Sequence, residues 1–153
     1  MHLRLIAVGR VRESYVAQAC ADFRKRLAPY FPYDETEVRA ADGSDPDNAM
    51  REEAERILKL LRPDDRLWVL DRTGTQLSSE ELSVRLEAVA HSGIGRLTFA
   101  IAGTFGADKR LRNRAEFLWS LSDLTFLHEW TRMIVLEQLY RAAKIARNEP
   151  YHH

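Results

Sequence analysis

The sequence has little that supports covalent cross-linking or membrane insertion. Its 153 residues include one cysteine, Cys20, so the chain can form no internal disulfide and no cysteine cluster for zinc. No apolar run approaches the length of about 20 residues that a membrane-spanning helix needs. The apolar start, residues 1–8, is too short for a signal-peptide core, and no small-residue cleavage site follows it. The length and these absences predict a cytoplasmic protein with one domain, residues 1–153.

An excess of charge of one sign is also missing, as are phosphate-binding glycine loops. The 23 Lys and Arg residues equal the 23 Asp and Glu residues, which argues against a nonspecific nucleic-acid coat protein. Residues 96–153 still carry nine Lys or Arg against six Asp or Glu, so a local basic surface could meet phosphate there. Residues 8–12 (VGRVR) are not a dinucleotide fingerprint, and no P-loop occurs. Ordinary Rossmann methyltransferases, dehydrogenases and nucleotide-binding enzymes are therefore poor candidates.

Strand-like and helix-like apolar patterns alternate along the chain. Short apolar runs predict strands, and a repeat of about 3.6 residues predicts helices. Ser78 followed by Glu81 is a capping-box pattern, and Pro46 suits the first position of another helix. The predicted strands are residues 3–8, 36–40, 66–70, 97–101 and 117–121, and the predicted helices are residues 13–27, 46–61, 78–92, a short charged segment after residue 106, and 130–147. This alternation predicts an α/β fold with a mostly parallel sheet and helices on both faces.

Three loops of this predicted sheet are candidate ligand sites. Ligands of parallel sheets bind beyond the carboxyl ends of the strands, where the connections diverge. The three loops follow Leu70, Ile101 and Leu121. The first of them, residues 71–74, is expected to turn the chain.

The second and third loops each have two interpretations. Gly103 and Gly106 would let the backbone approach a ligand or adopt a positive φ, although their spacing alone favours a simple strand-to-helix turn. Residues 122–128 mix hydroxyl groups with apolar side chains, which suits an adenine ring. The same segment could instead plug the core under the last helix, with His128 as the cap of that helix.

The last helix combines charged residues with an unusually wide apolar surface. Glu137 and Arg141 are four residues apart and can pair. Arg141 and Lys144 could reach phosphate, although a solvated stripe of ion pairs is the commoner arrangement. The apolar residues cover more than one face, so one face must be buried elsewhere. This coverage predicts a dimer interface.

The chain ends in Pro150, Tyr151, His152 and His153. A terminal histidine pair is compatible with the remnant of an expression tag. Against that interpretation, there is no longer histidine run, and Tyr151 offers a surface on which a base can stack.

Many spaced positions together resemble the RlmH family of SPOUT-class methyltransferases. The matching segments are residues 5–9, 70–74, 77–80, 120–122, 125–126, 128, 132, 137–142 and 150–153. The resemblance implies a SPOUT methyltransferase fold whose C-terminal segment threads a deep trefoil knot. It also implies a homodimer, with each active site between a cofactor pocket and the partner chain. The implied reaction uses S-adenosyl-L-methionine to methylate ring nitrogen 3 of a pseudouridine in 23S-type ribosomal RNA on assembled ribosomes.

The same resemblance assigns the cofactor positions, which fall on the three candidate loops. They are Leu70, Gly103, Ser122, Asp123, Leu124, Thr125, Phe126 and Leu127. The sequence departs from the family at three places: Ala102 replaces the first of two glycines, Leu127 replaces a proline, and residues 129–130 replace a Gln-Leu pair. Ala102 and Leu127 keep a second function open, that of a ribosome-binding or assembly protein of the same fold with weak catalysis.

The chemistry of the implied reaction suggests roles for the remaining polar residues. Methyl transfer needs in-line approach of the ring nitrogen, and the proton on that nitrogen must leave, which a general base assists. His152 is the first candidate for the base and His153 the second, with Tyr151 stacking on the flipped target base. The predicted catalytic residues are His152, His153, Tyr151 and Arg132, and the predicted RNA-binding residues are Arg141, Lys144 and His128. Neither a metal nor a membrane is expected to take part.

Overall fold

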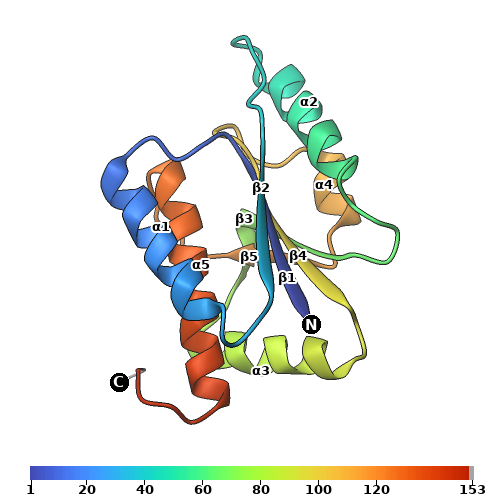
Figure 1. The fold of residues 1–153 in the computed structure, drawn as a ribbon. Coiled ribbons are helices and arrows are strands. Elements are labelled where there is room, and N and C mark those ends of the chain that lie inside the picture. The colour runs from blue at the N-terminus through green and yellow to red at the C-terminus, as the bar shows by residue number, and fades with distance from the viewer. Residues whose placement is uncertain (152–153) are drawn as a thin grey trace.

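A computed structural model describes residues 1–151 and shows a five-stranded sheet with helices on both faces (Figure 1). The strands are β1 (His2–Val8), β2 (Tyr33–Val38), β3 (Arg66–Gln76), β4 (Arg96–Ile101) and β5 (Phe117–Ser120). The helices are α1 (Ser14–Leu27), α2 (Pro46–Leu58), α3 (Ser79–His91), α4 (Lys109–Arg114) and α5 (His128–Ala146). The strand order is β2-β1-β4-β3-β5, and every neighbouring pair is parallel. The predicted α/β class and the strict alternation of strands and helices are confirmed.

Two apolar clusters hold the helices to the sheet. Side chains of successive strand residues point to opposite faces, so Leu5 belongs to the cluster under α1, α3 and α5, while its neighbour Ile6 belongs to the cluster under α2 and α4. Trp68 and Phe99 are the largest fully buried side chains and meet edge to face, with their ring centroids 5.6 Å apart. Figure 1 shows α1 and α5 on one side of the sheet and α2 and α4 on the other.

The local signals for helix starts are confirmed. The Ser78 hydroxyl accepts a hydrogen bond from the Glu81 N–H at 3.1 Å, and the Glu81 carboxylate accepts one from the Ser78 N–H at 2.7 Å. Asp45 caps α2 through its carboxylate, which accepts a hydrogen bond from the Asp47 N–H at 3.2 Å, with Pro46 at the first helical position. These caps satisfy backbone donors that the first helical turn leaves free.

The predicted turn after Leu70 is wrong in one respect, because β3 resumes after it. Trp119 of β5 lies opposite both Leu70 and Thr75, so residues 71–74 form a bulge inside one long strand. Gly74 makes this return possible, since a Cβ at that position would lie 2.3 Å from the Leu118 carbonyl oxygen. The sequence indicates the turn at residues 71–74. The strand pairing that follows the turn is with β5, which lies more than 40 residues further along the chain.

The family resemblance also implies a deep trefoil knot, in which the C-terminal segment threads through the chain. This knot stays a prediction. Within residues 1–151, no helix is both long enough and apolar enough to cross a membrane.

Candidate active site

A recess lies where the bulge of β3 meets the loop after β5. It is lined by Leu70, Asp71, Arg72, Trp119, Leu121, Ser122, Leu124, Thr125, Phe126 and Thr131. Two of the three loops that the sequence singled out, those after Leu70 and Leu121, therefore meet at one place. Five predicted cofactor positions take part: Leu70, Ser122, Leu124, Thr125 and Phe126.

Hydrogen bonds within residues 120–124 shape the floor of this recess. The Ser122 hydroxyl accepts a hydrogen bond from the Leu124 N–H at 3.0 Å, and the Ser120 hydroxyl donates to the Ser122 carbonyl at 3.2 Å. Leu124 is 70% exposed and Leu127 is 61% exposed, although both are large apolar side chains. Apolar surface left open beside a recess is typical of a site that a ligand or a partner chain covers.

Five lining residues, Asp71, Arg72, Trp119, Leu121 and Thr131, were not among the predicted cofactor positions. Trp119 is the second-last residue of β5, so its position at the carboxyl end of a predicted strand could have indicated it. Thr131 lies one helical turn beyond the loop, on the first turn of α5. The two loops and α5 thus enclose the recess from three sides.

Three predicted cofactor positions do not line the recess: Gly103, Asp123 and Leu127. Gly103 lies in a turn after β4 that is closed by a hydrogen bond of 3.0 Å from the Gly106 N–H to the Gly103 carbonyl. Because Ile101 pairs with Leu70, this turn follows the strand next to the recess. A positive φ, expected for either glycine, occurs at Gly106 (+95°) and not at Gly103.

His128 does not cap α5. The helix begins at His128 itself, and its N-cap residue, Leu127, makes no side-chain cap hydrogen bond. The Nε2 atom of His128 lies 3.2 Å from the Val8 carbonyl oxygen at the end of β1. His128 therefore connects the start of α5 to the sheet, and its role in RNA binding stays a prediction.

Arg132 is buried in an ion-pair cluster rather than exposed in the recess. Its Nη1 atom lies 2.6 Å from a Glu37 oxygen and 3.1 Å from a Glu35 oxygen, and its Nη2 atom donates to the Gly9 carbonyl at 3.0 Å. Arg24 binds the other oxygen of Glu35 at 2.9 Å. The guanidinium of Arg132 thus joins α5 to β1 and β2, and this geometry does not favour the predicted catalytic role.

We expect Arg132→Ala to lower the free energy of unfolding by about 1–3 kcal/mol, because it removes the buried guanidinium that pairs with Glu35 and Glu37 and leaves the Gly9 carbonyl without this donor. Arg26→Ala is the matched control, since Arg26 pairs with Asp22 on the surface of α1 and its loss should change stability little. Both are measured by urea denaturation followed by circular dichroism. Equal midpoints for the two variants would contradict a structural role for Arg132.

The tail returns along α5 and docks Tyr151 on it. The Tyr151 hydroxyl donates to Glu137 at 3.1 Å, and the ring lies 4.8 Å from the Tyr140 ring centroid and 4.7 Å from the Arg141 guanidinium carbon. Burial and the neighbouring Glu137 carboxylate raise the pKa of Tyr151. The ring is therefore held in place rather than free. His152 and His153 lie outside the described residues.

The predicted ion pair between Glu137 and Arg141 is confirmed, with a distance of 2.6 Å. Lys144 pairs with Glu149 at 2.7 Å. Both cations thus have carboxylate partners on or beside α5, as expected for a stripe of ion pairs. Phosphate would have to compete with these carboxylates, so RNA binding by Arg141 and Lys144 stays a prediction.

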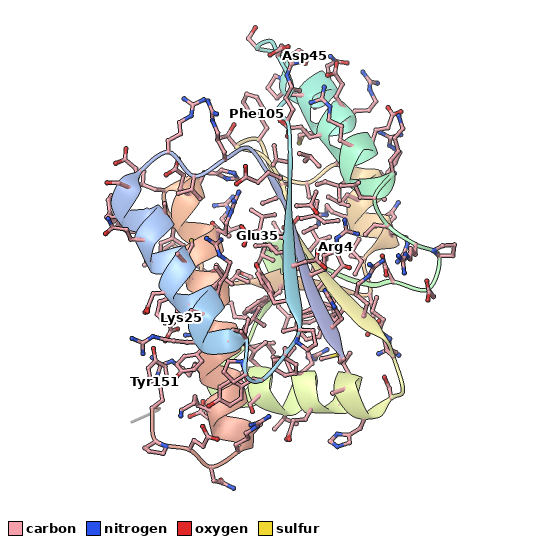
Figure 2. All side chains as sticks on the ribbon, viewed as in Figure 1. Arg4, Lys25, Glu35, Asp45, Phe105 and Tyr151 are labelled. Carbon is pink, nitrogen blue, oxygen red and sulfur yellow. The ribbon has the colours of Figure 1, made fainter. Side chains whose placement is uncertain are left out.

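The docked tail and the recess lie apart in a single chain. Thr131 lines the recess, whereas Tyr151 packs on Glu137 and Tyr140, which are roughly 9–14 Å further along α5 at 1.5 Å per residue. In Figure 2, Phe105, in the loop after β4, and Tyr151 lie near opposite ends of the molecule. Within one chain, Tyr151 therefore does not reach the recess.

Comparison with known proteins identifies the family. A family model described as "Predicted SPOUT methyltransferase" matches residues 1–152. The chain belongs to the SPOUT methyltransferase family. Three relatives are each named "Ribosomal RNA large subunit methyltransferase H". The one from Acetivibrio thermocellus is 44% identical and the alignment covers 99% of both chains. The one from Rubrobacter xylanophilus is 43% identical over 97% of this chain and 96% of the relative. The one from Gloeobacter violaceus is 40% identical over 100% of this chain and 99% of the relative.

Membership of the SPOUT methyltransferase family confirms the resemblance drawn from the spaced motifs. Within the described range, residues 1–151, no cluster of three or more His, Cys, Asp or Glu side chains could hold a metal ion. The recess itself offers apolar walls, hydroxyl groups, backbone groups and the charged side chains of Asp71 and Arg72.

Proposed function

We propose that this protein uses S-adenosyl-L-methionine to methylate ring nitrogen 3 of a pseudouridine in 23S-type ribosomal RNA on assembled ribosomes in the cytoplasm. The observation that carries the proposal is the recess between the bulge of β3 and the loop after β5, in a SPOUT methyltransferase similar over its full length to large-subunit ribosomal RNA methyltransferases. Parallel sheets bind their ligands beyond the carboxyl ends of strands, where the loop after β5 lies.

The recess fits the cofactor's chemistry. Leu70, Trp119 and Phe126 offer apolar surfaces for an adenine ring, and the hydroxyls of Ser122 and Thr125 with the loop backbone offer hydrogen-bonding groups. The bound cofactor would supply an electrophilic methyl group on a sulfonium. The protein's part is to hold that methyl group in line with the ring nitrogen of the target base.

Two of the three departures from the family pattern, Leu127 and Ala102, lie outside the lining of the recess. Leu127, in place of proline, does not line the recess, and its side chain points largely into solvent. Ala102, in place of glycine, is buried at the end of β4 and also lies outside the lining. Neither side chain narrows the recess, which supports an enzyme over an assembly protein with weak catalysis.

The separation of tail and recess supports a homodimer in which each recess receives the partner's tail. Residues 151–153 would then bring Tyr151 and His152 to the base, where Tyr151 stacks on it and His152 accepts the proton of the ring nitrogen. The cofactor would supply the methyl group and depart as a neutral thioether, and His152 would take up the proton that the ring nitrogen loses. The open Leu124 and Leu127 side chains lie beside the recess, where the partner would cover them.

Transfer of labelled methyl groups from S-adenosyl-L-methionine to ribosomes that lack the modification tests this function. The alternative, a ribosome-binding or assembly protein, predicts binding to the ribosome without transfer of label. Free ribosomal RNA in place of assembled ribosomes tests the required form of the substrate.

A further inference from the structure

Glu53, on α2, is a buried carboxylate with one oxygen unused. The residue is 5% exposed, and its Oε1 atom accepts a hydrogen bond of 3.1 Å from the Ala41 N–H in the loop before α2. Its Oε2 atom is buried and has no hydrogen-bond partner among the described residues. An unpaired buried acceptor costs stability, so the fold alone gives no reason for a glutamate here.

The carboxylate of Glu53 lies directly against Gly103. A Cβ at position 103 would lie 2.3 Å from Oε2, 2.8 Å from Cδ and 2.9 Å from Oε1 of Glu53. Gly103 does not have a positive φ, so its backbone conformation does not demand glycine. A side chain at position 103 would need the space that the Glu53 carboxylate occupies, so Glu53 would have to move away from the turn.

The turn that Glu53 touches stands beside the recess. It follows β4, whose last residue, Ile101, pairs with Leu70, and Leu70 lines the recess. Glu53 reaches this turn from α2, on the face of the sheet opposite to α5, while Thr131 of α5 lines the recess. Glu53 therefore supports the turn from behind.

We propose that Glu53 is a positioning residue for the cofactor: its carboxylate holds the turn at residues 103–106 in the place that S-adenosyl-L-methionine requires. This inference rests on the proposed function. Glu53 connects the turn to the loop at Ala41 and does not itself touch the cofactor. The effect is one of shape and packing, so a neutral side chain of the same size preserves it.

A double-mutant cycle tests the inference by calorimetric titration with S-adenosyl-L-methionine. Gly103→Ala should weaken binding about tenfold or more, because the new methyl group collides with Glu53. In a Glu53→Ala background the same substitution should have little further effect, because the space is now free. Equal losses in both backgrounds would mean that the cofactor, and not Glu53, excludes a side chain at position 103, which would overturn the inference.

The isosteric variant gives a second, independent measurement. Glu53→Gln should bind the cofactor within about threefold of the unchanged protein, whereas Glu53→Ala should lose about tenfold. In steady-state kinetics the Ala variant should raise KM for the cofactor and leave kcat and KM for ribosomes unchanged. Glu55→Ala, an exposed position on the same helix, is the control and should change nothing. Equal affinities for the Gln and Ala variants would overturn the inference, even if Gly103→Ala failed to fold.

Titration of the unchanged protein distinguishes a failure of this inference from a failure of the proposed function. No heat of binding with S-adenosyl-L-methionine would mean that the proposed function fails. Binding by the unchanged protein, with no coupling between positions 53 and 103, would refute the positioning role alone.

Discussion

Deletion of residues 151–153 lowers methyl transfer to ribosomes by about 10²- to 10⁴-fold, the range expected for loss of a general base. The deletion removes the candidate base, His152, and the ring of Tyr151 that stacks on the target. Affinity for S-adenosyl-L-methionine should not change, because Tyr151, the one deleted residue that the structure describes, does not line the recess. The measurement compares label incorporation and calorimetric titration for the truncated and the full-length protein.

The truncation also has a small structural cost. Tyr151 donates a hydrogen bond to Glu137 and stacks under Arg141, so its loss should lower the free energy of unfolding by about 1–2 kcal/mol. That amount leaves the protein folded. Full activity in the truncated protein would show that the tail has no chemical role, and the chemistry would then be sought at His128 and Arg132.

Single substitutions separate the parts of the tail. Tyr151→Ala should weaken positioning of the base, and His152→Ala should remove the acidic limb of the rate profile against pH. The sign follows from the role of a base: below its pKa, His152 is protonated and cannot accept the proton from the ring nitrogen. If His152 only contacts RNA, its replacement changes RNA affinity and leaves the pH profile as it was.

Two inactive variants, mixed and allowed to exchange chains, recover about a quarter of the full activity if the site is shared across a two-fold dimer. One variant lacks residues 151–153, and the other carries Gly103→Val, which we expect to abolish cofactor binding. About half of the dimers are then mixed, and each mixed dimer has one complete site, formed by an intact recess and the partner's intact tail.

Each variant measured alone, at the same total concentration, is the control for this experiment and should be nearly inactive. A site formed within one chain predicts no recovery on mixing, because no chain holds both an intact recess and an intact tail. Sedimentation of the unchanged protein as a 17.7 kDa monomer at micromolar concentration would also contradict the shared site.

Local signals in the sequence predicted most of the fold. Helix starts depend on contacts between residues that are close in the sequence. The structure has both predicted starts, one marked by Ser78 with Glu81 and the other by Pro46 after Asp45. The two loops after Leu70 and Leu121 meet because the carboxyl ends of adjacent parallel strands share one edge, which the order of elements already implied.

What the sequence could not show depends on contacts between distant segments. Arg132 looked available for catalysis because its partners, Glu35 and Glu37, lie nearly 100 residues earlier in the chain. Glu53 looked like one more acidic residue on a helix, and only its position against Gly103 gives it a role. A sequence pattern indicates on which face of a helix or strand a residue lies. Which residue it contacts there depends on how distant segments of the chain pack together.

The central claim is most directly tested by incubating the unchanged protein with labelled S-adenosyl-L-methionine and ribosomes that lack the modification. We expect about one methyl group per ribosome, at ring nitrogen 3 of a pseudouridine in the large-subunit RNA, and little or no label on free RNA. Ribosomes that acquire no label while still binding the protein would contradict the claim and favour the assembly function. Label on another nucleotide would show that the enzyme class is right and the proposed substrate wrong.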